Sequence, residues 1–461
     1  MDERKTPGRG KKFLWLVMMA AIVWAAIVTF RVGSAPSIQI DPALPGIGKR
    51  TPVGVSFEAP GRGLSRLQVE FVQGERQEVL AEAEHEPRPP WKFWGPATWR
   101  DELSVEVGSE TIEGLATGEA TIRASAWPAG TWLRHPVPQI QELTLPVRLT
   151  PPALQVHSMQ HYVSPGGSGV VVYSVGETAV RDGVQIEDWW FPGFPLPGDA
   201  SGRRFALLGV PFDLSAMQSI RLLAEDDVGN QVLVSFVDQF IPRQYRTDTI
   251  ELSDRFMERV VPAIMSATPG IQDQGSLLQN YLWINGELRR RNAETLVELA
   301  ADSRPEFLWN RTFQPMSNSQ VMSSFADRRT YRYQGQDVDQ QDHLGFDQAS
   351  VRHAEIQAAN SGVVALARYF GIYGNAVIID HGYGLMSLYG HLSSLGVSEG
   401  ESVERGQVVG RSGETGLAGG DHLHFTLLVQ GYPVNPVEWW DSAWIRDRFA
   451  AKLGDAFVFE Q

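Results

Sequence analysis

The uncharged run from Phe13 to Phe30 constrains this chain more than any other part of its sequence. As a helix rising roughly 1.5 Å per residue, the run spans about 27 Å, close to the hydrocarbon thickness of a bilayer. Basic residues precede it: Arg4, Lys5, Arg9, Lys11 and Lys12. The positive-inside rule then predicts a cytoplasmic tail over residues 1–12, a single-pass anchor over 13–30 and the bulk of the chain outside the cytoplasm.

A cleaved signal peptide is the alternative interpretation of the same run. It requires a shorter apolar core followed by a small-x-small cleavage site. Here Trp15 and Trp24 lie within a long run, Arg31 closes it, and Val32 to Ala35 is a weak cleavage candidate. The sequence favours an uncleaved anchor.

Composition limits what the remaining chain can be. A length of 461 residues predicts two to four domains with ample cores. The chain has no cysteine, so any transition metal would be held by His, Asp or Glu. The net charge of -14 argues against a nucleic-acid partner, because phosphate binding needs a dense cationic surface.

From about Ser37 to Phe240 the chain shows the alternating pattern of β-strands. Runs such as Val53 to Phe57, Leu67 to Phe71 and Gly169 to Val175 alternate apolar and polar residues or are rich in valine, between Gly, Pro and Asp clusters. They predict two β-sandwich modules of immunoglobulin-like type, at 37–150 and 151–245, which serve as spacers or docking modules. The Ala224 to Asn230 segment predicts a hairpin turn.

Helical spacing then appears between residues 250 and 305. Phe256, Met257, Val260, Val261 and Ile264 recur at helical intervals, and a second stripe begins after Ser276. Gly286, followed by three arginines, predicts a turn between two helices. This helical linker either packs on the next domain or acts as a lid or partner-binding arm.

The segment 310–440 combines short β-branched strands with most of the chemically active residues, and 441–461 is predicted to be a C-terminal tail. In Asp421-His422-Leu423-His424-Phe425, a strand would place His422 and His424 on one face and bury Leu423 and Phe425 on the other. Two imidazoles on one face form a metal-binding edge. Upstream, His343 and Asp347 lie four residues apart, and Tyr389-Gly390-His391-Leu392 supplies another imidazole.

These motifs together resemble the LytM-type, lysostaphin-like zinc peptidases of family M23. The resemblance rests on Ser323 to Arg328, His343-x-x-x-Asp347, Ile378 to Gly382, Tyr389 to Ser393, Gly406 to Gly410 and His422-Leu423-His424-Phe425. It implies a C-terminal antiparallel β-sheet catalytic domain in a mainly β chain. It also implies that His343, Asp347 and His424 hold one Zn²⁺, with an open position for water or substrate.

The resemblance assigns His391 and His422 to activating that water and stabilising the charged intermediate, without deciding which does which. His381 is expected to brace the sheet or a ligand, and His353 to lie at the surface. Two departures from the family pattern are the long polar segment from Arg329 to Asp342 and Thr426, where an acidic residue is common.

The implied function is a membrane-anchored zinc metalloendopeptidase of the bacterial inner membrane, with its bulk in the periplasm, hydrolysing peptide bonds in peptidoglycan stems or cross-bridges. Envelope proteins are candidate partners. The first alternative is a catalytically silent M23-like scaffold or activator of another cell-wall hydrolase. The second is a peptidase for small secreted peptides, which would need a deep, narrow pocket.

Overall fold

The computed structural model describes residues 9–460. The basic residues Arg4 and Lys5 of the predicted cytoplasmic tail lie outside this range. The chain is mainly β, with one apolar N-terminal helix and an antiparallel sheet domain towards the C-terminus, which confirms the predicted fold class. Two compact units are present: an N-terminal unit of Met1–Pro152, Thr178–Val180 and Glu225–Gln231, and a C-terminal unit of Ala153–Glu177, Arg181–Ala224 and Val232–Gln461. The predicted module boundaries within them stay a prediction.

Helix α1 (Arg9–Phe30) contains a segment, Lys12–Phe30, that is long and apolar enough to cross a membrane. None of this segment is buried within the chain, and side chains such as Phe13, Trp15 and Trp24 are exposed. A helix that is apolar all round and uncovered by its own chain suits a lipid environment. A membrane anchor and a signal sequence share these properties, so the uncleaved anchor stays a prediction.

The N-terminal unit contains two antiparallel sheets around one core. In β2 the side chains of Val53, Val55 and Phe57 are buried, and the residues between them face outward, because side chains alternate along a strand. One sheet has the order β1-β2-β5 and the other β4-β3-β6-β7. Their bounds are β1 (Ser37–Pro42), β2 (Thr51–Glu58), β3 (Leu64–Gln73), β4 (Arg76–Glu84), β5 (Arg100–Val107), β6 (Gly118–Pro128) and β7 (Gln139–Val147).

A second group of strands, most of whose residues belong to the C-terminal unit, has the order β15-β14-β11-β12-β13-β10-β8. These strands form one continuous path, because β12 pairs with β11 along one part and with β13 along another. The neighbours β14 and β15 form the predicted hairpin. The bounds are β8 (Leu154–Val156), β10 (Ser168–Val175), β11 (Ala179–Ile186), β12 (Trp189–Pro195), β13 (Arg204–Gly209), β14 (Ile220–Asp226) and β15 (Gln231–Val234); β9 (Tyr162–Val163) pairs with β16 (Gln239–Phe240).

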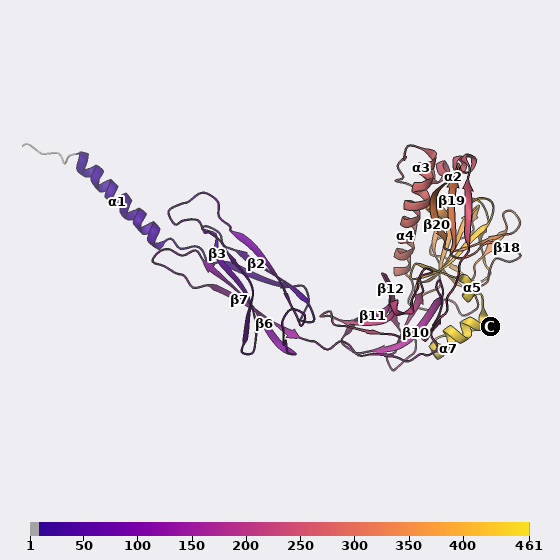
Figure 1. Cartoon of the computed structure of the whole chain (residues 1–461), viewed down its shortest axis with the longest axis horizontal. Helices are drawn as coiled ribbons and strands as arrows, with labels where there is room; N and C mark the ends of the chain where they lie inside the picture. Colours follow the sequence, from indigo (N-terminus) through magenta and orange to yellow (C-terminus); the bar gives the residue numbers. More distant parts are fainter. Residues whose placement is uncertain (1–8, 461) are drawn as a thin grey trace, which may run out of the picture. The chain divides into compact units, whose positions relative to one another are not determined.

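The predicted helical linker starts as a strand. β17 (Thr247–Leu252) pairs in parallel with β19 (Asp327–Tyr333), which pairs with β20 (Gln336–His343). α2 (Asp254–Ala267) and α3 (Leu277–Trp283) follow, with Ser253 and Ser276 as their N-caps. α2, α3 and α4 (Arg289–Ala301) lie beside β19 and β20 (Figure 1). Their apolar stripe, including Met257 and Tyr281, packs against Tyr331 and Ile372.

The prediction of a turn at Gly286 was wrong. Residues Ile284–Leu288 form a π-helical turn that joins α3 directly to α4. Helical backbone angles continue through Ile284 and Arg289, and the side chains of Ile284 and Leu288 are buried. Burial of these two residues holds the segment helical despite the low helix propensity of glycine.

An eight-stranded group forms the centre of the C-terminal domain. Its path is β18-β21-β29-β25-β24-β23-β27, with β30 paired to β29; β22, β28 and β26 form a small separate sheet. The bounds are β18 (Gln320–Ser323), β21 (Phe346–Ala349), β22 (Glu355–Gln357), β23 (Gly362–Tyr369), β24 (Asn375–Asp380), β25 (Leu385–Leu392), β26 (Ser394–Leu395), β27 (Ser402–Val403), β28 (Val408–Arg411), β29 (Leu423–Val429) and β30 (Tyr432–Val434).

The segment after β30, which includes the predicted tail 441–461, folds against this domain. It forms the short helices α5 (Pro436–Trp439), α6 (Ser442–Trp444) and α7 (Ala451–Leu453). Trp439 is buried and its indole N–H donates to the Ser168 hydroxyl on β10, at 3.0 Å. Phe449 joins the same core. These contacts tie the β8–β15 strands to the sheet domain.

Candidate metal centre

Three neighbouring strands and the end of a fourth bring the candidate residues together. His424 lies on β29 directly opposite Asp347 on β21, and His343 ends β20. On the other side of β29, Gly390 of β25 pairs with His424, which places His391 next to the group. Leu423 and Phe425 are buried in the core, as the alternation along the strand predicts.

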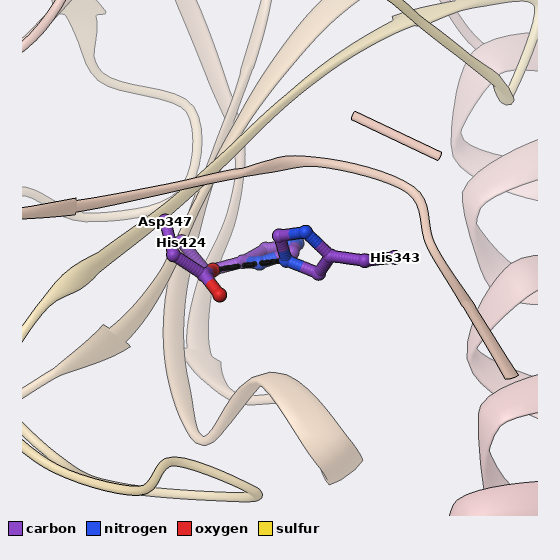
Figure 2. A group of neighbouring side chains, drawn as sticks. All are labelled: His343, Asp347 and His424. Atoms are coloured by element: carbon purple, nitrogen blue, oxygen red, sulfur yellow. Dashed lines mark hydrogen bonds and ion pairs between the residues drawn. The ribbon is translucent and has the colours of Figure 1, made fainter. Parts of the chain in front are cut away.

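The side chains of His343, Asp347 and His424 converge on a shared point (Figure 2). Asp347 Oδ1 lies 3.0 Å from His343 Nε2 and 2.9 Å from His424 Nδ1. The two imidazole nitrogens are 3.1 Å apart. All three side chains are buried, so water cannot readily replace these contacts.

The outer nitrogen of each imidazole fixes the state of the inner one. His343 Nδ1 lies 3.0 Å from the Ser324 carbonyl, which only accepts, so Nδ1 bears the proton. The Thr426 hydroxyl donates to the Leu344 carbonyl at 3.0 Å and therefore accepts from His424 Nε2 at 3.1 Å. When the rings are neutral, His343 Nε2 and His424 Nδ1 therefore carry lone pairs and no proton.

When both rings are neutral, two lone pairs and a carboxylate oxygen therefore face one another without a proton between them. Such atoms repel each other unless a cation lies at their centre. Ligand atoms around tetrahedral zinc are about 3.3 Å apart, given bonds of roughly 2.0–2.1 Å. The separations of 2.9–3.1 Å are close to that value. His, His and Asp, each oriented by an outer partner, are a donor set that fits zinc.

His424 is neutral and Asp347 is charged in this cluster. Burial lowers the pKa of His424 to about 4, so this imidazole is uncharged at neutral pH. Burial alone would raise the pKa of Asp347, but the charge and hydrogen bond that His343 supplies when protonated, with the hydrogen bonds of His422 and His424, outweigh it and hold that pKa well below its usual range. Asp347 is therefore ionised.

Arg329 orients the second oxygen of Asp347, a role that the sequence did not suggest. Its guanidinium donates to Asp347 Oδ2 at 3.0 Å, and its side chain is largely buried. Oδ1 is left to face the two histidines. Arg329 lies on β19, in the segment that departs from the family pattern, so this segment contributes to the site. In the sequence, the pair Arg328-Arg329 is the feature that could have indicated a basic residue near Asp347.

Gly345 is needed because of its close approach to His424. A Cβ atom at this position would lie 2.6 Å from both His424 Nε2 and Thr426 Oγ1. Real Cβ atoms do not approach other atoms so closely, so any larger residue would displace the His424 ring. The glycine in His343-Leu344-Gly345-Phe346-Asp347 thus makes room for the His424 ring and its partner Thr426.

His391 sits beside the cluster in an unusual backbone conformation. Its φ is 63°, a left-handed value that few non-glycine residues adopt and that is often found at functional sites. Gly390 and His391 lie where the pairing of β24 and β25 shifts register, and such bulges redirect side chains. His391 Nδ1 donates to the Thr415 carbonyl at 2.8 Å, leaving Nε2 for the cavity.

His391 and His422 differ in their protonation. Burial, aided by His422 and His424, holds the pKa of His391 well below its ordinary value, so the ring is neutral at pH 7. Burial also disfavours charge on His422, but the hydrogen bond and charge of Asp347 outweigh it and raise the pKa of His422. His422 Nδ1 donates to the Gly420 carbonyl at 2.8 Å, and Nε2 is 3.5 Å from Asp347 Oδ1. His391 is therefore suited to act as a base and His422 as a proton donor.

Two further histidines lie outside this cluster. His381 is fully buried, donates through Nδ1 to the Ser361 carbonyl and contacts the Ser387 hydroxyl, each at 2.7 Å, so it braces the sheet. His353 is 49% exposed, as predicted, with Nδ1 3.5 Å from Asp421.

The cluster opens into a cavity of about 370 Å³ within the C-terminal unit. The segment 250–289 supplies much of its lining, through Ile250, Glu251, Leu252, Phe256, Tyr281, Asn285 and Arg289. The sheet domain supplies the rest of the lining, including His343, His391, His422 and His424. The helical segment therefore both packs on the domain and forms a wall of the site.

Residues 341–436 match the model of Peptidase family M23, so this part of the chain is an M23 peptidase domain and the predicted family resemblance is confirmed. A DD-carboxypeptidase/endopeptidase Mpg of Neisseria meningitidis is 42% identical over 95 residues, covering 21% of this chain and 22% of the relative. Peptidoglycan DD-endopeptidase ShyA of Vibrio cholerae is 32% identical over 171 residues, covering 36% of each chain.

A third relative is named as an activator of a hydrolase and not as a peptidase. Murein hydrolase activator EnvC of Escherichia coli is 41% identical over 85 residues, covering 18% of this chain and 20% of the relative. The chain thus spans about a fifth to a third of the length of these curated relatives.

Replacing Thr426 with valine is expected to weaken zinc binding roughly ten- to a hundred-fold. Valine keeps the shape but removes the hydroxyl that accepts from His424 Nε2, so the ligand loses its fixed tautomer. Competition with a fluorescent zinc chelator measures the affinity. Thr426→Ser keeps the hydroxyl and should bind zinc nearly as wild type does; equal affinity in the valine variant would contradict this role.

Proposed function

We propose that this protein is a membrane-anchored zinc metalloendopeptidase that hydrolyses peptide bonds in the stems or cross-bridges of peptidoglycan. The convergence of His343, Asp347 and His424 is the observation that supports it best, because three buried acceptors face one another at zinc-like separations. Three protein ligands beside an open cavity are typical of a catalytic rather than a structural site.

Each residue of the site has a role in this proposal. Zinc, when bound by His343, Asp347 and His424, would polarise the scissile carbonyl and lower the pKa of the attacking water. His391, neutral and with Nε2 facing the cavity, accepts a proton from that water. His422 donates from Nε2 to the carbonyl oxygen as negative charge develops there.

The substrate and the location follow from different observations. Two relatives of the domain are named as endopeptidases, one of them as a peptidoglycan DD-endopeptidase, which supports peptidoglycan as the substrate. The apolar segment Lys12–Phe30 supports an anchor in the bacterial inner membrane, with the domain in the periplasm. The β-sandwich modules would then hold the domain away from the membrane or contact envelope proteins.

An activator of another hydrolase is the second candidate, since one relative is named a murein hydrolase activator. An activator needs the shape of the domain but no intact ligand set. Here all three metal-binding candidates and both flanking histidines are present and oriented by hydrogen bonds. This completeness favours the enzyme.

Digestion of purified peptidoglycan by the full-length protein in detergent tests the proposal. We expect cross-linked muropeptide dimers to be converted to monomers, as followed by chromatography and mass spectrometry. A chelator should stop the conversion and added zinc should restore it. If zinc-loaded protein leaves the dimers intact but stimulates a separate cell-wall hydrolase, the activator is the correct function.

A further inference from the structure

Arg289 faces the cavity from the helical segment, outside the matched family domain. It is the first residue of α4 and follows the π-helical turn Ile284–Leu288. Both Arg289 and the histidine cluster line the same cavity of about 370 Å³. A π-helical turn adds a residue to a helix at some cost in regularity and is frequent at functional sites. Here it aims Asn285 and Arg289 into the cavity.

Asn285 holds the Arg289 guanidinium in place. Arg289 Nε donates to the Asn285 carbonyl at 3.0 Å, and one terminal nitrogen donates to Asn285 Oδ1 at 2.7 Å. The Asn285 amide in turn donates to Asp339 of β20 at 2.7 Å. The buried Asn285 thus links the helix to the strand that ends at His343, and the remaining guanidinium N–H groups stay available.

Arg289 differs from the other charged residues of the cavity wall because it has no acidic partner. Arg329 pairs with Asp347 at 3.0 Å, and Glu251 lies 3.8 Å from Arg332. Within residues 9–460, no carboxylate lies within ion-pair distance of Arg289, whose neighbours include Tyr281 and Tyr373. A half-buried, fixed guanidinium without a direct acidic partner favours an anion, and its planar fork matches a carboxylate.

We propose that Arg289 binds a carboxylate of the peptide substrate and so makes the helical segment part of the substrate site. This inference rests on the proposed peptidase function and names the ligand class as a peptide with a free carboxylate near the bond to be cleaved. Arg289 acts in recognition and contacts no bond that is broken. The cavity volume lies in the range of sites that take small ligands or short peptide segments.

Binding of a matched pair of peptides tests this assignment. The probes are a synthetic peptidoglycan stem peptide with free carboxylates and the same peptide with its carboxylates amidated. Calorimetry on the full-length His391→Ala variant in detergent measures binding without turnover. A charge-assisted bidentate contact should make the free-carboxylate peptide bind roughly ten- to a hundred-fold tighter. In the His391→Ala/Arg289→Gln variant that preference should disappear.

Arg290 provides the matched control. It is the next residue on the same helix, is 56% exposed and pairs with Glu287 and Glu294. Arg290→Gln removes the same charge and should keep the preference for the free carboxylate. Arg289→Lys should retain part of it, because the charge remains without the fork.

The outcomes separate this assignment from the proposed function. Loss of the preference in Arg289→Gln alone, with an unchanged thermal melting curve, supports the assignment. If the Arg289→Gln variant unfolds, the two peptides are compared in Arg289→Lys and in Arg290→Gln instead. A preference for the free carboxylate that is weakened in Arg289→Lys and kept in Arg290→Gln then supports the assignment. Equal binding of both peptides, or a preference that survives Arg289→Gln, overturns the assignment. Failure of zinc-loaded wild type to cleave muropeptides overturns the enzyme instead, whatever the peptides bind.

Discussion

Replacing His424 with alanine is expected to remove zinc and to lower the rate of muropeptide hydrolysis by about a thousand-fold or more. Metal catalysis supplies several kcal/mol of transition-state stabilisation, and about 1.4 kcal/mol corresponds to a factor of ten. His424 Nδ1 lies 2.9 Å from Asp347 and 3.1 Å from His343, so its loss leaves two ligands. Zinc content by mass spectrometry and the rate of dimer cleavage measure both effects.

The surface residue His353 serves as the control for this variant. It is 49% exposed and lies outside the cluster, so His353→Ala should keep both zinc and activity. A His424→Ala protein that retains one zinc per chain and the wild-type rate would show that the ion lies elsewhere.

Replacing His391 with alanine is expected to slow hydrolysis by roughly a hundred- to ten-thousand-fold while zinc stays bound. General base catalysis typically contributes that factor. His391 is not in the group of convergent ligand atoms, and its Nδ1 is engaged with the Thr415 carbonyl, which leaves Nε2 as the base. Single-turnover rates on a muropeptide dimer, together with zinc content, separate the catalytic loss from loss of the metal.

The pH profile adds a second check on His391. Its pKa is held well below the ordinary value by burial, and a nearby bound cation would lower it further. The base therefore stays deprotonated as the pH falls from 7 to 6, and the wild-type rate should change little over that interval. A rate that halves near pH 6.5 would point to an unperturbed histidine, and zinc loss in His391→Ala would make that residue a ligand.

Local sequence patterns predicted the parts of the site that depend on one strand. The alternation in His422-Leu423-His424-Phe425 places both imidazoles on one face and buries Leu423 and Phe425 in the core. Bringing His343 and Asp347 to the same point requires pairing between β21 and β29, about eighty residues apart along the chain. That arrangement was available only through the resemblance to family M23.

Other contributions depend on tertiary contacts that no local pattern encodes. The parallel pairing of β17 with β19 brings the helical segment to the cavity. Arg329 and Thr426 each contribute a single hydrogen bond to a candidate ligand, Asp347 and His424 respectively. Gly286 reads as a turn, but the burial of Ile284 and Leu288 keeps the chain helical and positions Arg289.

A zinc titration of the chelated full-length protein, with the rate of muropeptide cleavage followed at each addition, tests whether zinc at this site catalyses the hydrolysis. We expect no cleavage without zinc, a rise in rate that saturates at one zinc per chain, and no rise in His424→Ala. Cleavage that persists after complete removal of zinc, or full zinc occupancy with no cleavage at any ratio, would contradict it.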